Sequence, residues 1–227
     1  MEQISTYISD TSPEYMNIAQ ISHEIRNPLT LINCTIQLLD GRYPQLKRDD
    51  LWIQLTKDVE YLRQLTLSLS DFNRCSHVSF SPVNMGQMLD SIARQYLLLA
   101  QIQGKHLSVI IPGELPVISC DEIKIHQALI NLIKNAFEAT QTGDIIEICA
   151  KTIGKRLTIS IKDTGSGIPK DYLEKIFDPF VTEKEGGTGL GLAITKKIIA
   201  SHKGIIRVYS REGIGTKFIL SLPISQK

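Results

Sequence analysis

Residues 18–39 read IAQISHEIRNPLTLINCTIQLL. Apolar residues recur in this stretch at steps of three and four, the spacing that places them along one side of an α-helix. They are Ile18, Ile21, Ile25, Leu29, Ile32, Ile36 and Leu39. The pattern predicts a helix over residues 14–40 whose apolar side faces a helical partner.

That partner is predicted to follow after a short loop. A turn over 41–47 contains Pro44, and residues 49–73 again carry one apolar side, from Leu51 to Phe72. Two amphipathic helices joined in this way form an antiparallel hairpin, which by itself has a thin core. We therefore expect two copies of the chain to pair as a dimeric four-helix bundle.

The pattern changes beyond residue 82 to a mixture of helices and strands. Helical spacing covers 85–103, 121–140 and 190–201, and strand patterns cover 107–111, 117–119, 145–152, 157–162, 205–210 and 217–222. Asp121 is expected to cap its helix. The predicted fold class is α+β multidomain. It comprises a helical hairpin over 1–75, a linker over 76–82 and an α/β sandwich domain, a sheet with helices on one face, over 83–227.

Composition excludes several classes of protein. The chain has 227 residues, a net charge of +1 and 42% hydrophobic residues. This charge gives no general attraction to nucleic acid, and no apolar run reaches the roughly 18 residues that insert across a membrane. The four cysteines lie far apart and without zinc-ligand spacing. We expect a cytoplasmic protein whose thiols are reduced and mostly buried.

The hexapeptide at 23–28, HEIRNP, is the first candidate site. Helical geometry puts His23 about 200° from the nearest apolar positions, so it is predicted to point into solvent, with Asn27 on the same face. An exposed histidine is most often only solvated surface. A neighbouring carboxylate such as Glu24 can instead fix the imidazole tautomer and leave the other nitrogen free to attack. Pro28 favours a bend in the helix.

The helix over 121–140 is predicted to carry a polar stripe. Asn131, Asn135 and Glu138 are spaced i, i+4 and i+7. A solvated face is the default explanation, but asparagine is a poor helix former, and two at one-turn spacing need a reason. A carboxamide oxygen is a neutral hard ligand for Mg²⁺, which otherwise keeps waters and phosphates. Asn135 with Asn131 is therefore a candidate metal site.

Two glycine-rich stretches complete the candidate site. Asp163, Gly165 and Gly167 follow a strand. They favour either a tight turn with glycines at positive φ, or a carboxylate that accepts a hydrogen bond from an adenine amino group. The second stretch opens a helix, where glycine N–H groups and the helix N-terminus are typical of a phosphate cradle. Its members are Lys184, Gly187, Thr188, Gly189, Leu190 and Gly191.

Two further pairs have open interpretations. Phe177 and Phe180 are expected either to anchor the two ends of a mobile flap or simply to pack. Gly213 and Gly215 are expected to form a hairpin turn, with lining of the pocket as a secondary alternative.

Taken in order, these stretches resemble bacterial sensor histidine kinases. They look like the H, N, G1, F and G2 boxes of that family: His23–Pro28, Asn131–Ala139, Asp163–Pro169, Phe177–Phe180 and Gly187–Gly191. The resemblance covers about residues 14–225. It implies a HisKA-type dimerisation hairpin, a GHKL-type catalytic domain, and ATP and Mg²⁺ as cofactors. The residues near Glu138, which replaces a more usual lysine, resemble the sporulation branch.

The resemblance also implies a role for each matching residue. His23 would accept the phosphoryl group of ATP and pass it to an aspartate of a response-regulator receiver domain. Glu24 would be its base, and Asn27 would position water in the reverse, phosphatase reaction. Asn135 would bind Mg²⁺ with help from Asn131, and Asp163 would read adenine. The nucleotide site and its lid would be shaped by Gly165, Gly167, Lys184, Gly187, Gly189 and Gly191.

The same resemblance distinguishes kinase from hydrolase. Related ATPases carry a glutamate, the general base for water, one turn before the asparagine of the N box. This chain has Asn131 there, and an amide cannot take a proton, so transfer to another nucleophile is favoured over hydrolysis. We therefore expect an ATP-dependent histidine autokinase of a two-component system. The alternatives are a bundle phosphotransferase that does not use ATP, and a GHKL-type serine kinase or regulator, which would lack the helix pair.

Overall fold

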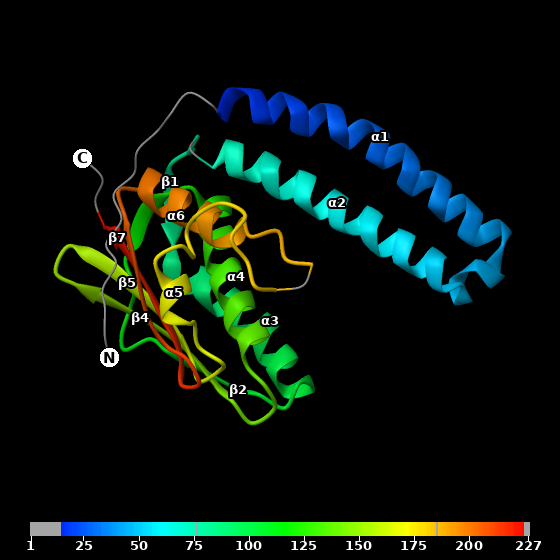
Figure 1. Cartoon of the computed structure of the whole chain (residues 1–227). Helices are drawn as coiled ribbons and strands as arrows, with labels where there is room; N and C mark the ends of the chain where they lie inside the picture. Colours follow the sequence, from blue (N-terminus) through cyan, green and yellow to red (C-terminus); the bar gives the residue numbers. More distant parts are fainter. Residues whose placement is uncertain (1–14, 76, 185, 225–227) are drawn as a thin grey trace. The chain divides into compact units, whose positions relative to one another are not determined.

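The computed structural model describes residues 15–75, 77–184 and 186–224, with the backbone alone over 15–23 (Figure 1). The chain divides into two compact units. One contains the two long N-terminal helices together with Pro179–Gly191. The other contains Cys75–Asp178 and the chain from Leu192 onward.

The two long helices of the first unit form the predicted helical hairpin. Helices α1 (Tyr15–Arg42) and α2 (Asp50–Arg74) are joined by the 3₁₀ helix η1 (Pro44–Arg48), so the predicted turn is itself partly helical. Helix α1 continues through Pro28. Asp49 caps α2, because its Oδ1 accepts the N–H of Trp52 at 3.0 Å.

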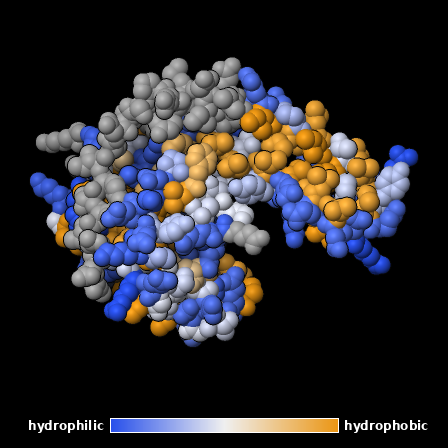
Figure 2. Space-filling view, viewed as in Figure 1, coloured by the Kyte–Doolittle hydropathy of each residue, from blue (hydrophilic) through white to orange (hydrophobic). Residues whose placement is uncertain are grey.

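Only part of the predicted apolar side is buried between these helices. Leu29 and Ile36 of α1 and Val59 of α2 are each 8% exposed. Other members of the pattern remain exposed in the single chain: Ile25, Ile32, Leu51, Leu55 and Leu62. Figure 2 shows apolar side chains, in orange, gathered along the surface of the two helices. Two helices cannot enclose a broader stripe, which explains the difference.

The second unit is built on a mixed five-stranded sheet with the order β2-β4-β5-β7-β6. Its strands are β2 (His106–Ile110), β4 (Ile145–Ile153), β5 (Arg156–Asp163), β6 (Ile205–Arg211) and β7 (Gly215–Pro223). Strand β2 is parallel to β4, and the other pairs are antiparallel. A separate antiparallel pair is formed by β1 (Ser81–Asn84) and β3 (Val117–Cys120).

The helices of this unit lie on one side of the sheet (Figure 1). They are α3 (Met85–Ile102), α4 (Glu122–Ala139) and α6 (Gly191–Ser201), with the single-turn α5 (Lys170–Leu173) beyond β5. Buried and more exposed residues alternate along β7, so one face of the sheet carries the core. This arrangement confirms the predicted α+β architecture of the C-terminal part.

Two features were not predicted, and for a third only the boundary differs. The linker over 76–82 was expected to lead into a strand, and that strand, β1, already begins at Ser81, where Pro82 weakens the strand signal because it lacks an N–H. Helix α5 was missed because one turn gives no periodicity. The parallel pairing of β2 with β4 joins segments far apart in sequence.

The cysteines follow the expectation in part. Cys75 and Cys120 are buried, Cys149 is half-buried, and Cys34 is exposed on α1. Over the described residues, no helix combines the length and the apolar character needed to span a membrane.

Candidate active site

Helix α4 carries the predicted polar stripe, in which Asn131 and Asn135 are half-buried. Leu129, Leu132 and Ile133 are fully buried, which turns Asn131 and Asn135 to the half-buried edge of the helix. Among the described residues, no group of three or more His, Cys, Asp or Glu side chains could hold a metal ion. Asn131 and Asn135 offer carboxamide oxygens at this stripe, a type of ligand that suits Mg²⁺ together with phosphate.

Asp163 lies at the end of β5 and is 4% exposed. Its Oδ1 accepts the backbone N–H of Gly165 at 3.0 Å and that of Thr216, in β7, at 3.2 Å. Burial raises the pKa of Asp163, the two N–H donors oppose the rise, and the charge of Asp144 adds to it. The net shift is upward. Both described hydrogen bonds engage Oδ1, so Oδ2 provides the acceptor capacity for a ligand.

Three glycines surround Asp163 where the backbone is too crowded for a side chain. An ideal Cβ would lie 2.1 Å from the carbonyl oxygen of Ala139 at Gly165, of Arg211 at Gly167 and of Asp163 at Gly215. Gly165 thus brings the end of β5 against the last residue of α4, and the N–H of Ser166 donates to the Ala139 oxygen at 3.0 Å.

One prediction about these glycines needs correction. Gly167 has φ +69°, as expected for a turn glycine, but Gly165 is not in the left-handed region. Close approach to α4 explains Gly165.

The segment Pro179–Gly191 belongs to the other unit and forms a loop closed at its neck. The N–H of Phe180 donates to the carbonyl of Gly189 at 3.1 Å. An added Cβ on Gly189 (φ +65°) would lie 2.5 Å from the carbonyl carbon of Phe180. Farther out, the N–H of Lys184 donates to Thr182 Oγ1 at 3.1 Å.

The structure therefore places the end of β5, which carries Asp163, against the last residue of α4, the helix that carries Asn131 and Asn135. The predicted phosphate cradle is a separately described loop: Lys184, Gly187, Thr188, Gly189 and Leu190, followed by Gly191 at the start of α6. Phe177 packs edge-on against Phe218 with ring centroids 6.5 Å apart, whereas Phe180 is 58% exposed with φ +68°. Packing accounts for Phe177 but not for Phe180.

Residues 120–226 match the family described as "Histidine kinase-, DNA gyrase B-, and HSP90-like ATPase". The solved catalytic domain of histidine kinase ThkA is 33% identical with a TM-score of 0.59, covering 64% of this chain and 96% of that one. The chain belongs to the histidine kinase family.

Curated relatives of this histidine kinase chain are longer. Signal transduction histidine-protein kinase AtoS of Escherichia coli (strain K12) is 34% identical over 213 residues, covering 92% of this chain and 34% of that protein. Sporulation kinase E of Bacillus subtilis (strain 168) is 32% identical over 212 residues, covering 92% and 28%. The chain thus spans about a third of these relatives' length. Because AtoS and sporulation kinase E are similarly identical to this chain, assignment to the sporulation branch stays a prediction.

A solved structure that covers most of this kinase chain is that of full-length ShkA in complex with AMPPNP. It is 28% identical with a TM-score of 0.79, and the match covers 96% of this chain and 47% of that one. Because the match takes in the helical hairpin as well as the sheet, it supports the same order of elements throughout this kinase.

The HEIRNP hexapeptide of the kinase lies within α1. The side chain of His23 is outside the described residues, so its predicted direction stays a prediction. Glu24 and Asn27 are exposed, and Leu29 is buried, as the helical spacing predicts for opposite sides of α1.

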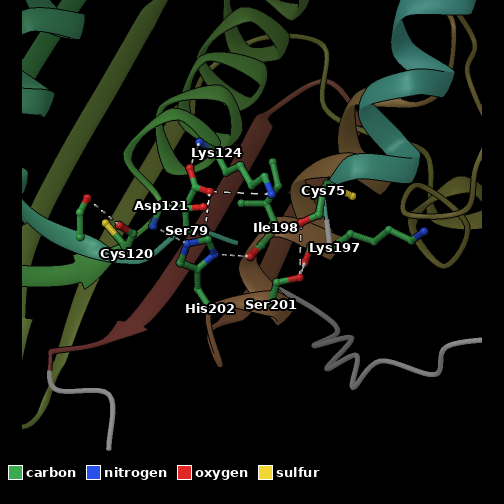
Figure 3. Close-up of polar contacts among 10 residues, drawn as sticks. Cys75, Ser79, Cys120, Asp121, Lys124, Lys197, Ile198, Ser201 and His202 are labelled. Carbon is green, nitrogen blue, oxygen red and sulfur yellow. Dashed lines mark hydrogen bonds and ion pairs between the residues drawn. The ribbon is translucent and has the colours of Figure 1, made fainter. Parts of the chain in front are cut away.

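Two groups of contacts in this kinase were not predicted. Gly215 was expected in a turn, with lining of the pocket as the alternative, and it packs against Asp163. The hydrogen bond from the N–H of Thr216 to Asp163 was missed. The bonds that join the exposed Ser79, the predicted cap Asp121 and the buried His202 were also missed (Figure 3). The available signals were Thr216 directly after the Gly-Ile-Gly stretch of 213–215, and a histidine directly after a predicted helix.

Proposed function

We propose that this chain is an ATP-dependent histidine autokinase that phosphorylates His23. The phosphoryl group is then passed to an aspartate of a response-regulator receiver domain. The observation that carries the proposal is Asp163, a buried carboxylate held by two N–H groups through Oδ1, beside the end of the helix that carries Asn131 and Asn135.

Asp163 is suited to recognise adenine. Its Oδ2 can accept a hydrogen bond from the 6-amino group, and a bond to a carboxylate in a buried site is stronger than one to a neutral acceptor. Guanine carries a carbonyl at the equivalent position and would meet the carboxylate without a donor. The site therefore favours ATP over GTP.

Helix α4 is suited to the phosphate end of the nucleotide. The carboxamide oxygen of Asn135, assisted by Asn131, would hold Mg²⁺, and the bound ion would neutralise phosphate charge during transfer. The cradle loop from Lys184 to Gly191 would add N–H donors and one positive charge. These residues position the terminal phosphoryl group and need do no covalent chemistry themselves.

The transfer step needs a nucleophile, which His23 supplies. One imidazole nitrogen forms the N–P bond while the bond from the γ-phosphorus to the bridging oxygen breaks, and ADP leaves with that electron pair. Glu24 accepts the proton from the other imidazole nitrogen. Asn131 cannot act as a base for water, so hydrolysis is disfavoured. In the reverse direction, Asn27 would position a water for dephosphorylation of the receiver.

A second copy of the chain is the partner that the hairpin requires. The buried positions Leu29 and Ile36 are seven residues apart, and so are the half-exposed Ile25 and Ile32 on the adjacent stripe. Leu55 and Leu62 repeat this half-exposed spacing on α2. An apolar stripe with a seven-residue period along two helices is typical of a four-helix bundle, so we infer a homodimer.

The receiver partner is proposed from the family. A structure of histidine kinase ThkA in complex with response regulator TrrA has the fold of this chain, with a TM-score of 0.67 at 24% identity. That complex is a property of ThkA, and here it supports only the choice of receiver domains as substrates to test.

The test of the proposed function is His23→Gln. We expect the variant to lose all incorporation of radiolabelled phosphate from ATP while its affinity for ATP stays unchanged. His106→Gln, at an exposed position of β2, is the matched control and should label like the unmodified protein. Label that survives His23→Gln would overturn the acceptor assignment. Absence of ATP binding in the unmodified protein would favour a phosphotransferase that does not use ATP.

A further inference from the structure

The chain that follows α2 is anchored to two helices of the ATP-binding unit within a few residues. At the end of α6, Ser201 Oγ lies 3.5 Å from the carbonyl oxygen of Cys75, and its hydroxyl donates to the closer carbonyl of Lys197, at 2.9 Å. The N–H of Ser79 donates to Asp121 Oδ2 at 2.9 Å. Phe80 then contacts the ring of His202 edge-on, with centroids 5.3 Å apart, before β1 begins at Ser81. Figure 3 shows this cluster between the start of α4 and the end of α6.

Asp121 performs two tasks with different oxygens. Its Oδ1 accepts the N–H of Lys124 at 3.1 Å and so caps α4, while Oδ2 holds Ser79. The ammonium of Lys124 lies 3.8 Å from Oδ2. Burial acts to raise the pKa of Asp121, but the N–H donors and Lys124 outweigh it, so the net pKa is lowered and the ionised form is favoured.

His202 fixes the backbone of the same residue. It is fully buried, its Nε2 accepts the N–H of Asp121 at 2.9 Å, and its Nδ1 lies 2.7 Å from the carbonyl of Ile198. Only a neutral imidazole with the proton on Nδ1 satisfies both contacts. Burial lowers the pKa of His202, in agreement with this state. The cap residue of α4 is therefore held from both its backbone and its side chain.

We propose that Asp121 is a positioning residue for phosphoryl transfer, which couples the segment leaving the hairpin to the helix that carries Asn131 and Asn135. The inference rests on the proposed function, because it concerns transfer from ATP to His23. A short, anchored connection restricts the approach of the hairpin to the bound nucleotide. Transfer rates depend steeply on such positioning, whereas nucleotide binding uses residues elsewhere on α4 and β5.

Asp121→Asn separates the two tasks. Asparagine is as good a cap as aspartate, so its Oδ1 keeps the bond to Lys124. Its Nδ2 is a donor and cannot accept the N–H of Ser79. We expect the autophosphorylation rate to fall about tenfold, while the dissociation constant for ATP stays within about twofold. Asp49→Asn, at the same kind of cap on α2, is the matched control and should leave both values unchanged.

Amide hydrogen exchange measures the hydrogen bond between Ser79 and Asp121 without depending on kinase activity. In Asp121→Asn the amide of Ser79 should lose protection while that of Lys124 keeps it. Ser79→Pro removes the N–H that donates to Asp121, so it should reproduce the loss of autophosphorylation rate. It provides an independent test if Asp121→Asn fails to fold. If the unmodified chain does not autophosphorylate, the proposed function fails, and the exchange data still report on the anchor.

Three results would overturn the proposal. The first is unchanged protection of Ser79 in Asp121→Asn. The second is a normal transfer rate after that protection is lost. The third is a fall in rate with a parallel loss of ATP affinity, which would indicate general damage to α4.

Discussion

The carbonyl oxygen of Asp163 occupies the space that a Cβ atom on residue 215 would need. The ideal Cβ position of Gly215 lies 2.1 Å from that oxygen, and Gly215 has φ +130°. The next residue, Thr216, donates its N–H to Asp163 Oδ1. The start of β7 therefore packs closely against the end of β5 at Asp163, the residue expected to recognise adenine.

Gly215→Ala should disturb both the fold and the site. The added methyl group must displace β7 from β5, which lengthens the bond from Thr216 to Asp163. We expect unfolding free energy to fall by about 1–3 kcal/mol and ATP affinity to fall at least about tenfold. Denaturant unfolding and equilibrium binding of an ATP analogue would measure the two effects.

Gly154→Ala is the control for this prediction. Gly154 also has positive φ, +58°, but no atom lies within 4 Å of its ideal Cβ. Gly154→Ala should lower the free energy of unfolding only by the cost of placing alanine at positive φ, and its ATP affinity should be unchanged. Equal losses of ATP affinity in the two variants would contradict the role assigned to Gly215.

Asp163→Asn should separate binding from stability. The amide Oδ1 can keep both N–H bonds, but its Nδ2 cannot accept from adenine. We expect ATP affinity to fall by about 10- to 100-fold, with little or no loss of unfolding free energy in nucleotide-free protein. Isothermal titration calorimetry and denaturant unfolding provide the test, and a variant that binds ATP normally would exclude Asp163 from adenine recognition.

The raised pKa of Asp163 also predicts a pH dependence. The folded state binds the proton more tightly than the unfolded state, whose carboxyl titrates near its ordinary value of 3.8. The contribution of this residue to unfolding free energy is therefore greatest below that value, and it declines as pH rises through the raised folded-state pKa. Asp163→Asn lacks this component, so the stability difference between the two proteins should change over that interval. A constant difference would be inconsistent with the shift.

Gly189→Ala should impair the loop expected to cradle phosphates. Its Cβ would collide with the carbonyl carbon of Phe180 and open the neck of the loop. We expect autophosphorylation at subsaturating ATP to fall at least about tenfold. Gly186→Ala is the matched control in the same loop, since Gly186 has φ +73° and no atom within 4 Å of its ideal Cβ. Similar losses in both would show that φ alone, rather than the contact at Phe180, limits the loop.

The half-exposed stripe on the hairpin predicts dimer-breaking substitutions. Ile32→Glu and Leu62→Glu would each place a charge where the second copy is expected to pack, and the dimer dissociation constant should rise at least about 100-fold. Light scattering after size-exclusion chromatography measures the change. Ile102→Glu, at a 74% exposed position of α3, is the control. Dimers that persist in the hairpin variants would place the interface on another surface.

Local patterns were sufficient to predict most elements of the fold. The apolar side of α4 and its Asp121 cap depend on residues three and four apart, so periodicity and capping chemistry identify them. The exposure of Leu51 could not be predicted from such patterns. The apolar spacing of one chain does not distinguish positions buried within the hairpin from positions that a second copy would cover.

The surroundings of the site depend on contacts between distant segments. Asp163 was predicted as a site residue, but its hydrogen bond to Thr216 joins β5 to β7. The requirement for Gly165 comes from Ala139 on α4, and a glycine-rich turn has the same local sequence whether or not a helix end packs against it. The bond between Asp121 and His202 joins the start of α4 to the end of α6, which are separated in sequence by β4, β5 and α5.

Strand β1 sets a limit on how this kinase can be recombined with foreign input modules. It pairs with β3 from Ser81 to Asn84, and the preceding Ser79 is already bonded to Asp121. A chimera fused after Asn84 would lack β1, so β3 would lose its pairing strand. It would also lack Ser79, so Asp121 at the start of α4 would lose the hydrogen bond from the Ser79 N–H. A fusion placed before Cys75 would carry both intact, so exchanges of the helical hairpin should be joined there.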